Sequence, residues 1–275
     1  MGPWLETIGV ILVAASGVLL GRALSALKKP YWILGYICPL LLIIIIAVAR
    51  FSGALSFVPH LSWLITGRTK FVILALTVTI GLTTPLSRLP RKCEKIIICL
   101  LMTIVVIWFS VLPFLVPALI KNRLLNSKTI IDLNGLCFQT TDYTCGPAAA
   151  VTALGKLGLK AEEGELAVLA HSSPVTGTLP HSLYSALKNR YEKQGLKCSY
   201  QYFDSIDQLK NDGITLVALS DSFLVDHCVA VLEVSDKMVT IADPVSGRTR
   251  LTRERFGKLW RSAGIVLQRD TAQSI

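Results

Sequence analysis

Acidic residues are almost absent from the first half of the sequence. Residues 1–128 contain only Glu6 and Glu94 beside 13 lysines and arginines, whereas residues 129–275 contain 16 acidic and 15 basic residues. The basic surplus therefore belongs to the first half, where it flanks long apolar runs as the loops of membrane proteins do. The near-neutral second half has no basic patch of the kind that binds nucleic acid, so we expect no nucleic-acid partner.

The sequence also lacks the motifs of several common kinds of site. Its seven cysteines form no CxxC pair and no Cys/His spacing typical of zinc, so we expect no metal and no cofactor. Their odd number does not favour a disulfide framework, although a single bridge stays open. There is no GxxxxGK[ST] motif, so the chain is expected to carry no P-loop nucleotide site of its own.

Four long apolar runs occupy the first half of the chain. They cover Thr7–Leu24, Tyr31–Ala49, Phe71–Leu86 and Ile96–Ile120. Because about 20 helical residues cross the hydrocarbon core of a bilayer, we predict four transmembrane helices in a membrane domain at residues 1–126. No basic residue precedes the first run, which argues against a cleaved signal peptide. The sequence thus predicts a multi-pass integral membrane protein, placed in a bacterial inner membrane.

The stretch Phe51–Arg68 is harder to interpret, because Pro59, His60 and Trp63 lie among scattered serines. An interfacial or re-entrant segment fits it best, and a fifth span would move the rest of the chain to the other side of the membrane. With four spans, the basic residues divide almost equally between the two sides. The start of the chain has no basic residue, which favours an outside N-terminus, and with it a second domain outside the cytoplasm.

Residues 127–275 show the patterns of a folded soluble domain. Helices are predicted at Cys145–Leu157, Glu163–His171, Pro180–Gln194, Ser205–Asn211 and Thr252–Trp260, and strands at Lys197–Phe203, Ile214–Ser220, His227–Val234, Met238–Ala242 and Gly264–Gln268. Helices first and an antiparallel sheet afterwards predict an α+β domain.

Cys145 lies where a loop is expected to become a helix. Pro147 suits the first helical turn, and the alanines that follow it favour helix strongly. A thiol at a helix N-terminus is favoured as the thiolate, the form that attacks carbonyl groups. On these residues alone, a nucleophile and a small buried thiol are equally good interpretations.

The residues around Cys145 and two later segments resemble those of one family. A helix with Cys followed by a sheet with His is the order of papain-like cysteine peptidases. Within that group, the sequence closely resembles the bacteriocin-processing, or double-glycine, cysteine peptidases of family 39. The resemblance covers about half of the chain and rests on Gln139 six residues before Cys145, on Cys145-Gly-Pro-Ala, on Asp226-His227 opening one apolar strand, and on Asp243-Pro244 closing the next.

The resemblance implies a papain-like fold and a cysteine endopeptidase. It implies that Cys145 is the nucleophile, that His227 is the general base and acid, that Asp243 orients the imidazole, and that Gln139 donates to the oxyanion. Asp226 is the weaker candidate for orienting His227, because neighbouring strand residues point to opposite faces. The expected partners are a peptide or protein substrate and the lipid bilayer.

The chain departs from the family's pattern in its domain order. The family is best known as the N-terminal domain of peptide-exporting ABC transporters, whereas here the membrane helices come first. An exporter partner would therefore be a separate protein. The substrate bond is expected to follow a Gly-Gly pair, although the resemblance by itself does not establish this preference. Two alternatives stay open, namely a non-catalytic peptide-binding domain that assists export, and another papain-like acyl-transfer enzyme such as an amidase or a transglutaminase-like protein.

Overall fold

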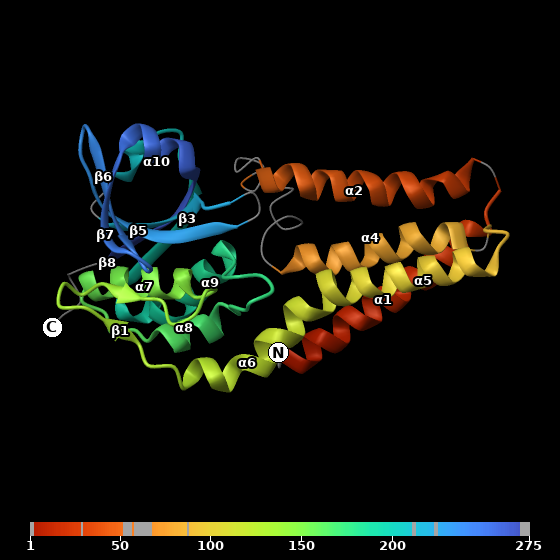
Figure 1. Ribbon diagram of the computed structural model, residues 1–275, viewed down its shortest axis with the longest axis horizontal. Coiled ribbons are helices and arrows are strands. Elements are labelled where there is room, and N and C mark those ends of the chain that lie inside the picture. The colour runs from red at the N-terminus through yellow and green to blue at the C-terminus, as the bar shows by residue number, and fades with distance from the viewer. Residues whose placement is uncertain are drawn as a thin grey trace. The chain divides into compact units, whose positions relative to one another are not determined.

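The computed structural model describes residues 3–28, 30–51, 57, 68–86, 88–210, 213–222 and 225–269. The chain divides into two compact units, Met1–Leu119 and Ile120–Ile275 (Figure 1). The domain boundary expected between residues 126 and 127 stays a prediction. Most of the stretch Phe51–Arg68 lies outside the described residues.

The first unit is built from long apolar helices. They are α1 (Pro3–Ser25), η1 (Tyr31–Ile33), α2 (Leu34–Phe51), α4 (Thr69–Leu86), α5 (Lys92–Val106), the π-helical segment η3 (Ile107–Val111) and α6 (Leu112–Leu125), which continues into the second unit. By length and composition, four helices in the described residues could cross a membrane, at Trp4–Ser25, Tyr31–Val48, Thr69–Leu86 and Lys92–Leu125. Large apolar side chains on α1, α2 and α5 are exposed, as is expected of surfaces that face lipid.

Two glycines allow α1 and α4 to approach closely. A Cβ atom added at Gly21 would lie 2.8 Å from Cβ of Thr83 and 2.9 Å from the carbonyl oxygen of Ile80. A Cβ atom at Gly17 would collide with the side chain of Thr79. Small residues at such positions let helix backbones approach each other, which is the main source of packing energy between helices in lipid.

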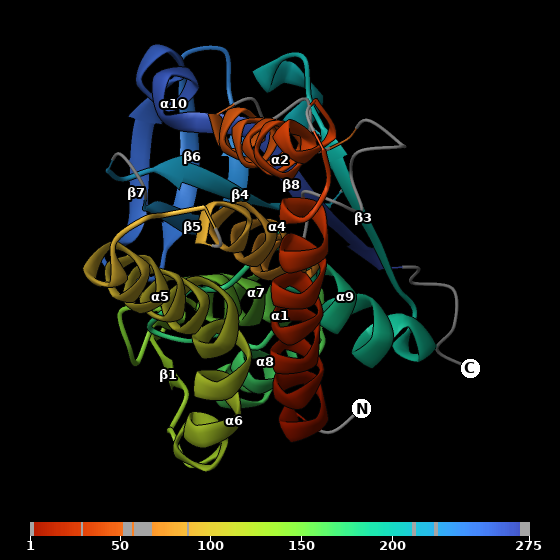
Figure 2. The same ribbon diagram turned by 90° about the vertical axis from the view of Figure 1, so that its right-hand side faces the viewer.

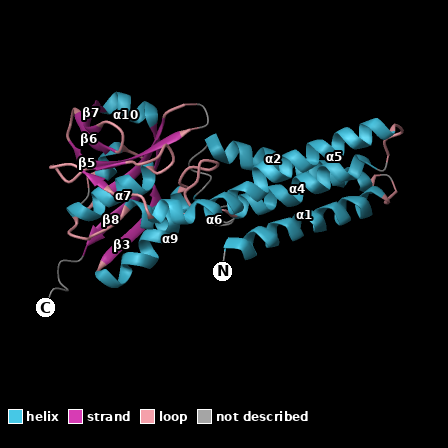
Figure 3. Ribbon diagram, turned by 60° about the horizontal axis from the view of Figure 1, so that its bottom comes forward, coloured by secondary structure: helices cyan, strands magenta, loops and turns pink. Residues whose placement is uncertain are grey.

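The second unit contains helices followed by a sheet, as the α+β prediction requires. Its elements in chain order are β1 (Ile130–Ile131), β2 (Cys137–Phe138), α7 (Cys145–Lys156), α8 (Glu163–Leu169), α9 (Pro180–Tyr191), η4 (Glu192–Gln194), β3 (Leu196–Tyr202), η5 (Ile206–Leu209), β4 (Ile214–Ser220), β5 (Asp226–Val234), β6 (Met238–Asp243), β7 (Gly247–Thr252), α10 (Arg253–Leu259) and β8 (Trp260–Arg269). All strands of the described residues belong to this unit, and Figure 3 shows the strands of its main sheet.

The main sheet has six strands in the order β3-β8-β4-β5-β6-β7, and all neighbouring pairs are antiparallel. The last strand, β8, inserts between β3 and β4, so the sheet is complete only when the end of the chain is in place (Figure 2). Ala230 of β5 pairs with Ala242 of β6. Since the two strands run in opposite directions, the first residues of β5 and the last residues of β6 lie at the same end of the sheet.

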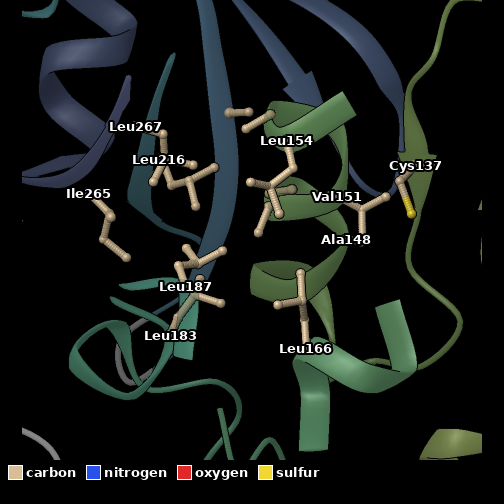
Figure 4. Packing of buried hydrophobic residues seen from close by; sticks show 14 of the residues in the cluster. Cys137, Ala148, Val151, Leu154, Leu166, Leu183, Leu187, Leu216, Ile265 and Leu267 are labelled. Carbon is tan, nitrogen blue, oxygen red and sulfur yellow. The ribbon is translucent and has the colours of Figure 1, made fainter. Parts of the chain in front are cut away.

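Both faces of the sheet are covered, so the unit has two apolar cores. On one face α7, α8 and α9 pack their buried alanines and leucines against Leu216, Ala230, Ile265 and Leu267 (Figures 1 and 4). On the other face Phe256 of α10 packs with Trp260 and with alternate residues of β4, β5 and β6. The alternation along β5 is regular, since Val229 and Val231 belong to the second core and Ala230 to the first. The structure thus confirms the α+β prediction.

Some predicted elements differ from the observed ones. The strand β7 and the two-residue strands β1 and β2 were not predicted, and β8 begins at Trp260 rather than Gly264. The sequence of β7, Gly-Arg-Thr-Arg-Leu-Thr, has few apolar residues because β7 is an edge strand with alternate side chains in solvent. Its short polar pattern carries little of the signal on which strand prediction depends.

Candidate active site

Cys145, His227 and Asp243 come from three different elements and meet at one end of the sheet. Cys145 is the first residue of α7, His227 is the second residue of β5, and Asp243 is the last residue of β6. The register of β5 and β6 brings His227 and Asp243 to the same end. Ala148, Ala150 and Val151 pack α7 into the core on this sheet, which fixes where Cys145 lies.

The imidazole of His227 contacts both of the other side chains. Its Nε2 atom lies 2.7 Å from Oδ1 of Asp243, and both side chains are mostly buried. The hydrogen bond to Asp243, together with a hydrogen bond to the Cys145 side chain, raises the pKa of His227 to about 10. Since Nε2 is taken by the carboxylate, Nδ1 is the ring nitrogen left for the sulfur. At neutral pH the ring is therefore protonated, and it lies between the Asp243 carboxylate and the Cys145 sulfur.

Asp243 is fixed by the turn that follows it. Its Oδ1 accepts the Val245 N–H at 2.8 Å, and its Oδ2 accepts the Ser246 hydroxyl at 2.6 Å. Burial by itself would raise the pKa of Asp243, but the hydrogen bonds from His227, Ser246 and Val245 outweigh it and hold the pKa below its usual value. The carboxylate is therefore ionised and held in one orientation, as a group that orients a histidine must be.

The loop before Cys145 is held by hydroxyl groups. The Thr144 side chain is fully buried and makes no cap bond to α7; its hydroxyl accepts the Thr141 N–H at 3.2 Å and donates to the Thr141 carbonyl at 3.0 Å. The Thr178 hydroxyl donates to the Tyr143 carbonyl at 3.0 Å. Because no N-cap side chain occupies the start of α7, the first N–H groups of the helix are available to a ligand.

Gln139 lies beside the carboxylate end of this site. Its backbone N–H donates to the Pro244 carbonyl at 3.0 Å, which ties the loop to the residue after Asp243. Its side-chain oxygen is buried and has no hydrogen-bond partner within the described part of the chain. The structure thus places all four predicted residues around one end of β5 and β6.

The neighbours of His227 in the sequence have other environments. Asp226 binds Arg261 through an Nε–Oδ1 ion pair of 3.0 Å. Cys228 packs against the core beneath the helices. Burial raises the pKa of the Cys228 thiol, and the nearby Cys145 raises it further. These contacts agree with the interpretation of Asp243, rather than Asp226, as the residue that orients His227.

Of the remaining cysteines of this unit, Cys137 is buried and Cys198 is partly buried. Burial raises the pKa of Cys137 to about 12 and that of Cys198 to about 11, which keeps both thiols protonated. All seven cysteines lie in the described residues and all are free, so no bridge forms. Within the described residues, no group of three His, Cys, Asp or Glu side chains is placed to hold a metal ion.

The sequence of the chain also matches the profile of a known family. The profile of the peptidase C39 family matches residues 135–273, about half of the chain. The chain belongs to the peptidase C39 family. The matched segment contains Cys145, His227, Asp243 and Gln139, and it has the papain-like arrangement of a helix with Cys packed on a sheet with His.

Proteins similar to this C39 member include an uncharacterized protein of Methanothermobacter marburgensis. The two are 32% identical over 132 residues, which is 48% of this chain and 87% of that protein. Among solved structures, the peptidase domain of Streptococcus ComA, a bi-functional ABC transporter, is 20% identical with a TM-score of 0.44 and covers 52% of this chain and 100% of that domain. A double glycine motif protease from an AMS/PCAT transporter, in complex with the leader peptide, is 16% identical with a TM-score of 0.43 and covers 53% of this chain and 96% of that one.

Several residues that support the site were not predicted. Ser246 has a recognisable signal, since an Asp followed by polar residues in a turn often accepts hydrogen bonds from them. Thr178 and Glu163 have no such signal, because each reaches the loop before Cys145 from a segment more than 20 residues away. Only the packing of α8 and α9 against α7 brings them there.

Proposed function

We propose that this chain is a membrane-anchored cysteine endopeptidase that hydrolyses a peptide bond in a peptide or protein substrate. The observation that supports this proposal most strongly is the contact of one imidazole, that of His227, with both Asp243 and Cys145. Membership of a cysteine peptidase family supports it independently.

In the proposed reaction, the Cys145 sulfur attacks the scissile carbonyl carbon. The carbonyl oxygen becomes an oxyanion, the C–N bond then breaks, and the proton on His227 passes to the leaving amine. This leaves the N-terminal product bound to Cys145 as a thioester. Water attacks the thioester while His227 takes its proton, the carboxylic acid product leaves, and the starting state returns. Asp243 keeps Nε2 engaged throughout, so that Nδ1 faces the reacting atoms.

Gln139 and the first turn of α7 would stabilise the oxyanion. The backbone N–H of Cys145 is one donor, because the first N–H groups of a helix have no partner inside the helix. The side-chain amide of Gln139 is the second donor. One such donor contributes on the order of 3 kcal/mol to transition-state stabilisation in comparable sites.

The substrate we propose is a leader peptide cleaved after a Gly-Gly pair. The peptidase C39 family suggests this substrate class, and a leader peptide is what the AMS/PCAT protease holds in its own structure. An exporter that carries the released peptide would be a separate partner.

The proposal is tested with the full chain purified in detergent or nanodiscs. Synthetic peptides with a Gly-Gly leader are incubated with the wild type and with Cys145→Ala, and the products are identified by mass spectrometry. Cleavage after Gly-Gly by the wild type alone is the expected result. Cys198→Ala, which changes a partly buried cysteine of the same unit, serves as the control and should keep full activity. Equal processing by wild type and Cys145→Ala would end the proposal, and binding without cleavage would favour a peptide-binding domain.

We also propose that the helices of the first unit anchor the chain in a bilayer, with the peptidase unit outside the cytoplasm. Four helices of sufficient length and apolar character support the anchor, and the lack of Lys and Arg before the first apolar run supports the sidedness. A reporter active in one compartment only, fused after Ile275, tests the sidedness. Activity of a cytoplasmic reporter in that fusion would overturn it.

A further inference from the structure

A buried carboxylate lies directly behind the loop that carries Gln139. Glu163 is the first residue of α8 and is 0% exposed. Its Oε1 atom accepts the backbone N–H of Thr140 at 2.9 Å. Carboxylates are seldom fully buried unless they are paired or hydrogen-bonded, because transfer from water is costly. The burial of Glu163 therefore needs an explanation, and the backbone group to which its side chain bonds supplies one.

Glu163 holds one side of a loop whose other side is held at Pro244, the residue after Asp243. Gln139 and Thr140 are consecutive, and their two backbone N–H groups bond in different places. The Gln139 N–H donates to the Pro244 carbonyl at 3.0 Å, and the Thr140 N–H donates to Glu163. With both N–H groups fixed, the backbone on each side of the Gln139 Cα atom is held, and so is the origin of its side chain.

The start of α8 is itself held in place. The Thr129 hydroxyl accepts the backbone N–H of Glu163 at 3.0 Å and bonds to the Glu162 carboxylate. At the next position, a Cβ atom on Gly164 would lie 2.9 Å from the Ser127 hydroxyl oxygen and would collide with the Leu124 carbonyl. Residues 124–129, at the start of this unit, therefore pack directly on the first turn of α8, which carries Glu163.

We infer that Glu163 is a positioning residue for the oxyanion site, which acts by fixing the backbone of Thr140 and thereby aiming the amide of Gln139. This inference rests on the proposed peptidase function. It assigns Glu163 no contact with the substrate, and it predicts that its effect on catalysis passes through Gln139. Displacement of a catalytic group by about 1 Å can lower a rate by about 100-fold, so a residue behind the loop can matter strongly.

The test is a double-mutant cycle on cleavage of a leader peptide by the full chain. Glu163→Met removes the acceptor while filling most of the volume, Glu163→Gln keeps a carbonyl that can accept the Thr140 N–H, and Gln139→Ala removes the proposed donor. We expect Glu163→Met to lower kcat about 10- to 100-fold with little change in KM, and Glu163→Gln to restore most of the loss. Glu165→Ala is the matched control, since Glu165 lies on the same helix but is partly exposed and pairs with Arg190 at 2.8 Å.

The deciding comparison is made in the Gln139→Ala background. If Glu163 acts through Gln139, adding Glu163→Met to Gln139→Ala should lower kcat by less than about threefold more, because the amide to be aimed is already absent. If the two losses multiply, Glu163 acts independently of Gln139 and the inference is wrong. If the wild type cleaves no peptide, the proposed function fails first, and the inference fails with it.

Alkylation of Cys145 by iodoacetamide separates positioning from damage to the fold. Alkylation needs the sulfur but no oxyanion site, so its rate at Cys145 should be nearly unchanged in Glu163→Met. A fall in alkylation that parallels the fall in kcat would show a general disruption of the site and would overturn the inference.

Discussion

The Nε2 atom of His227 lies 2.7 Å from the Oδ1 atom of Asp243, and the Val245 N–H and the Ser246 hydroxyl bond to the same carboxylate. The aspartate is therefore oriented by its own turn before it orients the histidine. Because Nε2 is bound to Asp243, Nδ1 is the nitrogen of the imidazole that is left for Cys145.

The pH dependence of the reaction should follow from this pair. Asp243 and Cys145 raise the pKa of His227 to about 10 from its usual 6.5. Because the protonated ring supplies the proton to the leaving amine, activity should persist well above neutrality and fall as the pH approaches that value. The contribution of the protonated ring to folding stability has the same sign: it is fully present below 6.5 and is lost as the pH rises through about 10. A pH–rate profile together with NMR titration of the histidine Cε1–H signals measures both.

Asp243→Asn should shift that profile. Without the carboxylate the pKa of His227 falls toward its usual value, so the alkaline loss of activity moves to lower pH. At neutral pH we expect kcat to fall by up to about 10⁴-fold, the loss seen when an orienting aspartate is replaced by its amide. Ser246→Ala is the milder comparison, since it removes one donor to Oδ2 and keeps the carboxylate that contacts His227. An unchanged alkaline limb in Asp243→Asn would show that Asp243 does not hold the imidazole.

The cysteines of the peptidase unit should differ sharply in reactivity. Burial raises the pKa of Cys137, Cys198 and Cys228, so their thiolate fractions at neutral pH are very small. A short pulse of iodoacetamide at neutral pH should therefore label Cys145 first, as read by peptide mapping of the folded chain. The same pulse on the unfolded chain, where all four react, provides the reference. Preferential labelling of Cys228 would point to a different nucleophile.

Gly146 should be intolerant of a side chain. A Cβ atom there would lie 3.0–3.2 Å from the side chains of Thr178 and Leu183, which hold the loop and the first core. Gly146→Ala should destabilise the unit by about 1–3 kcal/mol and displace the start of α7, with a matching loss of activity. Gly155→Ala is the matched control on the same helix, where nothing lies within 4 Å, and it should gain about 0.5–1 kcal/mol. Thermal unfolding followed by circular dichroism compares the two variants.

The packing of α1 on α4 makes a separate prediction for the first unit. Gly21→Leu would force a side chain against Thr83 and the Ile80 carbonyl, so it should lower the unfolding temperature of the purified chain in detergent. Gly9→Leu, on the same helix but with nothing within 4 Å, should leave that temperature nearly unchanged. Equal unfolding temperatures for the two variants would show that this close approach is not needed.

The sequence predicted those parts of the fold whose signals are local. The helix at Cys145 has a proline at its start and a run of alanines, and β4, β5 and β6 are apolar runs that end at turn residues, so each could be read from its own segment. The edge strand β7 could not, because an edge strand with one solvated face needs few apolar residues. Nor could the place of β8 between β3 and β4, since pairing between distant segments has no local signature.

The candidate site likewise contains residues that the sequence could predict and residues that it could not. Cys145, His227, Asp243 and Gln139 could be predicted because their residue types and their order resemble a known pattern. Glu163 and Thr178 could not, because a glutamate and a threonine look like surface residues in the sequence until the packing of α8 and α9 brings them to the loop before Cys145.

The proposed role of Cys145 as the nucleophile is tested most directly by trapping the covalent intermediate. The full chain is mixed with a Gly-Gly leader peptide, quenched in acid within the first turnover, digested and mapped by mass spectrometry. The proposed mechanism predicts that the peptide containing Cys145 gains the mass of the leader fragment. The signal of this adduct should be weaker in Asp243→Asn and absent in Cys145→Ala. Cleavage of the leader with no adduct at Cys145, or with the adduct at another cysteine, would contradict this mechanism.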